Sequence, residues 1–150
     1  MAIISDYITS DLIVDIVADT SVDVIDALVG ALDTAGKLRD RDLFFDAILE
    51  REDAVTTAIG SGIAIPHAKL SEYDDFFIVI GIIRDGVEWN ALDGKPVTIA
   101  FMVGGPDDKQ ARYLQMLSEI TMLAKDETRR EKMLTLSPEE IAALITEQGA

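Results

Sequence analysis

The residues with the most evident chemical potential lie in one stretch, residues 60–69, which reads GSGIAIPHAK. This stretch holds the only histidine of the 150-residue chain, His67. Histidine serves both as a neutral nucleophile and as a proton carrier near pH 7. Pro66 lacks an amide N–H and disfavours helical backbone at Ile65. We therefore expect His67 on extended backbone or at the end of a strand, outside any helix.

The composition narrows the chemistry that the rest of the chain can add. With 49% hydrophobic and 27% charged residues, the chain has enough apolar material for a substantial core. It has no cysteine, which excludes disulfides, zinc–thiolate sites and thiol catalysis and fits a reducing compartment. No cluster of metal-ligating residue types stands out, so we expect neither a metal nor another cofactor.

The charge of the chain is strongly acidic, with a formal net charge of −15. Such a surface repels nucleic acid and anionic lipid, so neither is an expected partner, whereas a basic protein would be attracted. No apolar run reaches the ~18 residues of a membrane span, and the N-terminal residues lack the basic region of a signal peptide. We therefore expect a cytoplasmic protein without direct membrane insertion.

An apolar and mostly β-branched run predicts a strand at Leu12–Val17, and two nearly continuous apolar runs predict buried strands at Phe76–Ile83 and Val97–Val103. The segment Val55–Ile59 is expected to be extended and to lead into the histidine stretch. Residues 84–96 contain the only tryptophan and the turn sequence LDGKP, so they are predicted to form a loop.

Amphipathic patterns predict five helices between and after these runs. Their expected starts are Thr20 or Ser21, Asp40 or Asp42, Asp107 or Asp108, Asp126, and the capping box Ser137-Pro138-Glu139-Glu140. The first helix should stop near Gly36 and the second near residues 50–52, with Leu43 on the inner side of the second. Buried strands between such helices imply one three-layer α/β/α domain over residues 1–150, with a central mixed sheet flanked by helices.

The segment 49–69, LEREDAVTTAIGSGIAIPHAK, resembles the signature of enzyme IIA domains of the bacterial phosphotransferase system, of the fructose/mannitol/nitrogen-regulatory class. Three further segments agree with this family in the right order: ALDGKPV at 91–97, the strand ending at Val103, and LQMLS at 114–118. The resemblance covers nearly the whole chain. Because no fused membrane or IIB domain accompanies it, it points to a stand-alone, nitrogen-regulatory-like member.

The resemblance implies a phosphotransferase component that carries a phosphoryl group on histidine. His67 would accept the group from a histidine-phosphorylated, HPr-like carrier protein and pass it to an EIIB domain or a regulatory target, or hold it as a regulatory signal. Arg51 matches the arginine of the family and would bind two phosphoryl oxygens with its guanidinium. Thr56 or Thr57 would donate a hydroxyl hydrogen bond, and the backbone amides of Gly60, Ser61 and Gly62 would form an anion nest.

Tyr113 departs from the family pattern. Family members typically carry a second histidine at this position, just before the LQMLS segment. A tyrosine hydroxyl can still donate a hydrogen bond, but it cannot take a positive charge. This departure motivates the alternative that the protein is a regulatory binding module impaired in phosphorylation.

Structural alternatives remain open for the other candidates. Arg51 in isolation is a surface ion-pair partner for Glu50 or Asp53. Tyr113 is either an aromatic at the edge of the core or a hydroxyl in the site, and Thr56 is equally a simple strand former. A hydrolase with His67 as general base is disfavoured, because no nucleophile or metal constellation accompanies the histidine and no GxSxG elbow is present.

Overall fold

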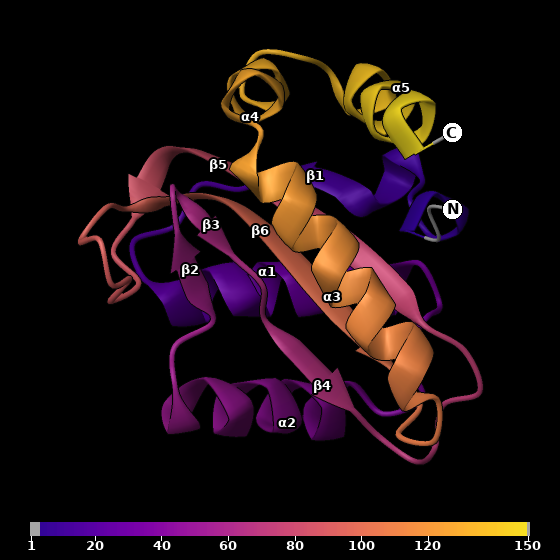
Figure 1. The fold of residues 1–150 in the computed structure, drawn as a ribbon. Coiled ribbons are helices and arrows are strands. Elements are labelled where there is room, and N and C mark those ends of the chain that lie inside the picture. Colours follow the sequence, from indigo (N-terminus) through magenta and orange to yellow (C-terminus); the bar gives the residue numbers. More distant parts are fainter. Residues whose placement is uncertain (1–3, 150) are drawn as a thin grey trace.

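A mixed six-stranded sheet lies between two layers of helices in the computed structural model, which describes residues 4–149 and the side chains of residues 4–146 (Figure 1). The helical elements are η1 (Ile4–Asp6), η2 (Ser10–Leu12), α1 (Ser21–Thr34), α2 (Arg41–Ala54), α3 (Gln110–Lys125), α4 (Glu127–Met133) and α5 (Pro138–Gly149). The strands are β1 (Ile13–Asp15), β2 (Ala58–Gly60), β3 (Ile63–Ala64), β4 (His67–Lys69), β5 (Phe77–Val87) and β6 (Val97–Gly105).

Each face of the sheet has its own hydrophobic core. On one face, α1 and α2 pack with side chains such as Leu28 and Phe44. On the other face, α3, α4 and α5 pack with η1, and Met116 and Ile120 of α3 are fully buried there. The predicted three-layer α/β/α architecture with a mixed sheet is therefore confirmed.

The strand order is β1-β5-β6-β3-β2, and β4 also pairs with β6. The ladders β1–β5, β3–β6 and β4–β6 are parallel, whereas β5–β6 and β2–β3 are antiparallel. The long β5–β6 hairpin thus forms the centre of the sheet. Figure 1 shows α3 running across one face of it and α2 lying beside β4.

Strands β3 and β4 behave as one strand that is interrupted at Ile65-Pro66. Ile63 pairs with Ile99 and His67 pairs with Val103, so both pieces keep the same parallel register with β6. Pro66 cannot donate a backbone hydrogen bond, but its carbonyl accepts one from the amide of Val103 at 3.0 Å. Because β2 pairs with β3 only, the outer edge of β4 has no strand partner within the described residues.

Most predicted helix starts are confirmed by capping hydrogen bonds. The amide of Asp23 donates to the Thr20 hydroxyl at 3.1 Å, and the amide of Leu43 donates to the Asp40 carboxylate at 3.1 Å. The predicted capping box also forms, with reciprocal bonds between Ser137 and Glu140 at 3.1 and 3.2 Å. These contacts connect residues three apart, which is why the sequence reveals them.

Five expectations about the elements are wrong. The strand predicted over Leu12–Val17 is only Ile13–Asp15, because Leu12 ends η2 and Val17 is 91% exposed. Strand β5 continues to Val87 into the predicted loop, because β6 offers it a hydrogen-bonding partner even where its side chains are polar. Helix α2 continues to Ala54, and Leu43 on it is 46% exposed. Helix α3 starts at Gln110 after Lys109, which gives no side-chain cap, so neither Asp107 nor Asp108 caps it.

Candidate functional site

His67 is the first residue of β4, on the interrupted edge strand, and its ring is half-buried. Its placement on extended backbone is as predicted from Pro66. The ring Nδ1 lies 2.7 Å from the carbonyl oxygen of Ile65. Since a carbonyl only accepts hydrogen bonds, a neutral ring must carry its proton on Nδ1. The lone pair of the neutral imidazole is then on Nε2.

The surroundings of His67 favour this neutral form. Burial lowers the pKa of His67, and the positive charges of Arg51 and Lys69 lower it further. The hydrogen bond to Ile65 and the carboxylate of Glu52 oppose this effect. The result is an imidazole that is uncharged at neutral pH and available as a nucleophile.

An open pocket of about 590 Å³ lies beside His67, between the end of α2, the edge strand β4 and the start of α3. Its lining residues are Ala47, Glu50, Arg51, Ala54, His67, Ala68, Lys69, Leu70 and Tyr113. The pocket therefore brings together the three residues that the sequence indicated as the reacting centre, from segments far apart in the chain.

Arg51 occupies the last turn of α2 and lines this pocket. Its Nη1 donates to the carbonyl oxygen of Val55 at 2.8 Å, which links the guanidinium to the chain just after the helix. In the described part of the chain, no carboxylate lies within ion-pair distance of Arg51, so the alternative pairing with Glu50 or Asp53 does not form. The guanidinium keeps donors free for an anion in the pocket.

Tyr113 lies in the first turn of α3 and is 4% exposed. Its ring centroid is 5.8 Å from that of His67, and its ring stacks on Phe76 at 6.1 Å. The hydroxyl is buried and has no hydrogen-bond partner among the described residues. Burial raises the pKa of Tyr113 well above its usual range, so the hydroxyl keeps its proton. Tyr113 is thus both a core aromatic and an unsatisfied donor beside the pocket, a combination that ordinarily carries a free-energy cost.

Lys69 is a pocket residue that the sequence reasoning missed. Its Nζ donates to the side-chain oxygen of Gln110 at 2.5 Å and lies 4.8 Å from the centre of the Tyr113 ring. Lys69 stands two residues after His67, and alternate residues of a strand point to the same face. That spacing was the available signal for a second cation beside the histidine.

The predicted phosphate-binding hydroxyls of Thr56 and Thr57 are engaged elsewhere. Thr56 Oγ1 donates to the carbonyl oxygen of Trp89 at 3.0 Å. Thr57 is buried, and its hydroxyl and amide donate to the two carboxylate oxygens of Glu52 at 2.5 and 2.7 Å. Trp89 adds a third donor to Glu52 at 3.1 Å. These hydrogen bonds stabilise the end of α2, so neither hydroxyl is directed into the pocket.

The turn Gly60–Gly62 likewise lies outside the pocket lining. All three of its residues have positive φ, of 95°, 58° and 80°, which explains the glycines on either side of Ser61. The amide of Ser61 donates to the Asp93 carboxylate at 2.8 Å, and such backbone bonds lower the pKa of Asp93. The Asp93 carboxylate therefore already accepts the hydrogen bond that the Ser61 amide of the predicted nest would give to a phosphate.

The described residues contain no group of three or more histidine, cysteine, aspartate or glutamate side chains arranged to hold a metal ion. Within the same range, none of the helices combines the length and the hydropathy that crossing a bilayer requires.

Comparison with known proteins shows the family of this chain. The family model for the phosphoenolpyruvate-dependent sugar phosphotransferase system, EIIA 2, matches residues 7–148. The chain is 39% identical over 125 residues to the fructose-specific EIIABC component of Bacillus subtilis, which covers 83% of this chain. The match spans only 20% of the length of that relative.

Solved structures show the same fold. The nitrogen regulatory protein IIA-Ntr of Neisseria meningitidis superposes with a TM-score of 0.88 at 25% identity, over 95% of this chain and 99% of that one. Enzyme IIAMTL of Escherichia coli, in its complex with phosphorylated enzyme IIBMTL, superposes with a TM-score of 0.79 at 19% identity, over 93% and 97% of the two chains. Because the family model matches residues 7–148, the chain belongs to the EIIA 2 family of the phosphoenolpyruvate-dependent sugar phosphotransferase system.

Proposed function

We propose that this protein is a phosphoryl carrier in which Nε2 of His67 accepts a phosphoryl group from phosphohistidine on an HPr-like carrier protein. One observation carries the proposal: His67 lines an open pocket together with Arg51, which forms no ion pair among the described residues, and Tyr113, whose buried hydroxyl has no hydrogen-bond partner among them. A nucleophile, a cation and an unsatisfied donor in one place suit a tetrahedral dianion.

In the proposed transfer, the Nε2 lone pair of His67 attacks phosphorus while the N–P bond of the donor phosphohistidine breaks. The electron pair of that bond returns to the imidazole of the donor. The proton on Nδ1 of His67 stays in place, and the Ile65 carbonyl at 2.7 Å stabilises the positive charge that the ring gains. No further proton transfer is needed, so alignment and charge stabilisation account for the catalysis.

The pocket side chains take complementary roles in this proposal. Arg51 binds phosphoryl oxygens through the donors that its bond to Val55 leaves free. Lys69 adds a second positive charge on the same strand as the nucleophile. The Tyr113 hydroxyl gains its missing hydrogen bond only when a phosphoryl oxygen is present, so it stabilises the phosphorylated state over the free one.

The onward partner follows from the family and not from the pocket. E. coli enzyme IIAMTL forms a complex with phosphorylated enzyme IIBMTL. For this chain, we propose an EIIB-type domain or a regulatory protein as the acceptor, in the cytoplasm, where carrier proteins of this system meet their targets.

A second candidate function is a regulatory binding module that does not relay the phosphoryl group. It is favoured by Tyr113, whose buried hydroxyl stays neutral and so cannot supply the positive charge of a second histidine. Under this alternative, Tyr113→His raises the rate of transfer onto an EIIB-type acceptor, and binding of a regulatory partner is insensitive to His67→Ala. Rapid transfer by the wild type to such an acceptor contradicts the alternative.

The phosphoryl-carrier proposal is tested by incubating the protein with radiolabelled phosphoenolpyruvate and the general phosphotransferase proteins. We expect acid-labile label on the wild type and none on His67→Ala or on the near-isosteric His67→Gln, with circular dichroism showing that both variants fold. In protein labelled with ¹⁵N-histidine, NMR should place the phosphorus on Nε2. Absence of label on the wild type, or phosphorylation at Nδ1, overturns the proposed chemistry.

A further inference from the structure

The first turn of α3 presents Tyr113 to His67, yet this helix start lacks the local stabilisation that the other helices have. Lys109 stands at the N-cap and makes no side-chain capping bond, and no acidic residue lies in the first turn. Uncapped helix starts leave backbone amides unsatisfied and tend to fray. Something else must hold this turn if Tyr113 is to stay at its position.

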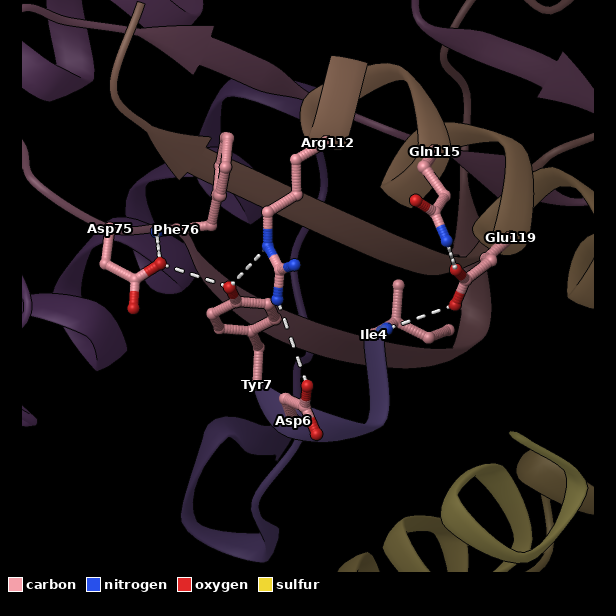
Figure 2. A network of polar contacts seen from close by, with 8 residues as sticks. All are labelled: Ile4, Asp6, Tyr7, Asp75, Phe76, Arg112, Gln115 and Glu119. Atoms are coloured by element: carbon pink, nitrogen blue, oxygen red, sulfur yellow. Dashed lines mark hydrogen bonds and ion pairs between the residues drawn. The ribbon is translucent and has the colours of Figure 1, made fainter. Parts of the chain in front are cut away.

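A polar network from the N-terminal segment reaches this turn (Figure 2). The Nε of Arg112, next to Tyr113, donates to the hydroxyl of Tyr7 at 3.0 Å. The same hydroxyl donates to Asp75 Oδ1 at 3.1 Å, and the backbone amide of Phe76 donates to that oxygen at 2.8 Å. The Tyr7 hydroxyl therefore joins three segments: the N-terminal residues, the start of α3 and the loop before β5.

A row of aromatic rings runs from this network to the candidate site. Tyr7 meets Phe76 edge-on at a centroid distance of 6.4 Å, Phe76 stacks on Tyr113 at 6.1 Å, and Tyr113 lies 5.8 Å from His67. A Cβ at Gly105 would approach the Phe76 ring to 2.3 Å, so glycine there is what lets the ring lie in this row. A displacement of the Phe76 ring would therefore displace the Tyr113 ring that stacks on it.

Further contacts tie the same segments together. Lys109 Nζ donates to the carbonyl oxygen of Asp74 at 2.8 Å, and the amide of Ile4 donates to Glu119 in the third turn of α3 at 3.1 Å. Figure 2 shows Ile4 and Tyr7 approaching α3 from the N-terminal segment while Asp75 and Phe76 approach it from the loop. In contrast, the Arg112–Asp6 pair spans 3.9 Å at an exposed site and contributes little.

We infer that Tyr7 is a positioning residue for the proposed phosphoryl site, because its hydroxyl bridges Arg112 and Asp75 and thereby holds Phe76 against Tyr113 and Tyr113 against His67. The inference rests on the proposed function for its effect on phosphoryl transfer, but its effect on α3 and on the His67 ring is independent of that function. Tyr7 touches neither His67 nor the pocket; it acts through α3 and the ring of Phe76.

The test is Tyr7→Phe in the full chain, which keeps the ring and removes only the bridging hydroxyl. We expect amide hydrogen exchange in residues 110–116 to rise about tenfold, because one turn loses its anchor. The ring-proton resonances of His67 should shift, because the neighbouring Tyr113 ring moves. The maximal rate of phosphoryl transfer should fall about tenfold, with the half-saturating concentration of the carrier unchanged, since only alignment is affected.

Tyr73→Phe is the matched control. Tyr73 lies in the same loop as Asp75, but its hydroxyl accepts from the amide of Arg39 at 3.4 Å, and its ring packs in the core on the other face of the sheet. This variant should leave exchange in residues 110–116, the His67 resonances and the transfer rate unchanged. Equal effects of the two variants would reduce Tyr7 to a general stabilising residue and overturn the inference.

Arg112 provides a second measurement. Arg112→Ala should reproduce the effects of Tyr7→Phe, Arg112→Lys should restore part of the transfer rate, and the double variant should be no worse than either single one. Additive effects contradict a shared bridge. If the wild type takes no phosphate on His67, the proposed function fails, while hydrogen exchange and the His67 resonances still decide whether the bridge exists.

Discussion

The two helix ends that frame His67 are held in different ways. At the end of α2, Arg51 bonds to Val55 four residues on, and Glu52 accepts two bonds from Thr57 five residues on. At the start of α3, the contacts reach Tyr7 and Lys69, which lie 105 and 41 residues from their partners. The cationic side of the pocket is therefore built mainly within one short segment, and the tyrosine side depends on the whole fold.

This difference explains why the motif at residues 49–69 contains Arg51 and His67 but not Tyr113. The segment 49–69 contains Arg51, the Val55 carbonyl that it bonds to, and His67, so one motif holds both the cation and the proposed nucleophile. Tyr113 belongs to a helix turn whose position is set by residues outside any such motif. We therefore expect substitutions at the α2 end to have large and simple effects, and those at the α3 start to separate activity from stability.

The largest effect is expected for Arg51→Ala. Loss of the guanidinium removes charge stabilisation of the transferring group, and we expect phosphoryl transfer to His67 to slow by about 100-fold or more. Rapid-quench labelling measures this rate. Stability should change little, because the bond from Arg51 to Val55 is exposed. The transfer rate of Arg51→Lys should lie between those of the wild type and Arg51→Ala, since an ammonium cannot bind two oxygens in a fixed fork. Labelling of Arg51→Ala at the wild-type rate would exclude this role.

Glu52→Ala, at the same end of α2, should lower the stability of the protein. The buried hydroxyl and amide of Thr57 and the indole N–H of Trp89 would lose their acceptor. We expect the free energy of unfolding, measured by urea denaturation, to fall by about 2–3 kcal/mol. Glu50→Ala on the same helix is the control and should stay within about 0.5 kcal/mol of the wild type, because Glu50 is exposed. Equal losses would show that the Glu52 contacts add nothing.

At the other helix end, Tyr113→Phe should separate activity from stability. The hydroxyl has no partner among the described residues, so its removal should leave the free energy of unfolding unchanged or raise it by up to about 1 kcal/mol. The transfer rate should fall about tenfold, which is the effect of losing one hydrogen bond made only with the phosphoryl group. Parallel loss of stability and rate would mean that the hydroxyl has a partner already.

The smallest effect concerns pH. The folded protein lowers the pKa of His67, chiefly by burial, so protonation of Nε2 occurs at a lower pH than the ~6.5 of a free histidine. Phosphoryl acceptance should therefore persist below that value and decline only as the folded pKa is passed. As pH falls, the unfolded chain binds a proton on His67 at a higher pH than the folded protein does. The stability contributed by neutral His67 is therefore fully present above pH ~6.5 and is lost as pH falls from that value toward the lower pKa of the folded protein.

Lys69→Gln tests the cause of the lowered His67 pKa, because it removes one of the positive charges acting on His67. The pKa of His67 should move up toward the ordinary value. NMR titration of the ring protons reads this directly, and assignment is simple because the chain has one histidine. A pKa that stays where it is, or moves down, would show that the Lys69 charge does not reach the ring.

Much of the fold could be predicted because its signals are local. Thr20, Asp40 and Ser137 cap helices through bonds to residues three positions on, and Pro66 alone places His67 on extended backbone. The sequence also indicated Arg51, His67 and Tyr113 as the reacting centre, and the structure brings them into one pocket.

The tertiary structure alone decided which polar groups remain free for an anion. Glu52 takes the Thr57 hydroxyl and Asp93 takes the Ser61 amide, whereas the Tyr113 hydroxyl is left without a partner in the described chain. A residue type states what a group can bond, but the groups around it in the fold determine whether that bond is already made. The local sequence thus determined the proposed nucleophile, His67, and the strand that carries it, and long-range packing determined which donors around it are already bonded.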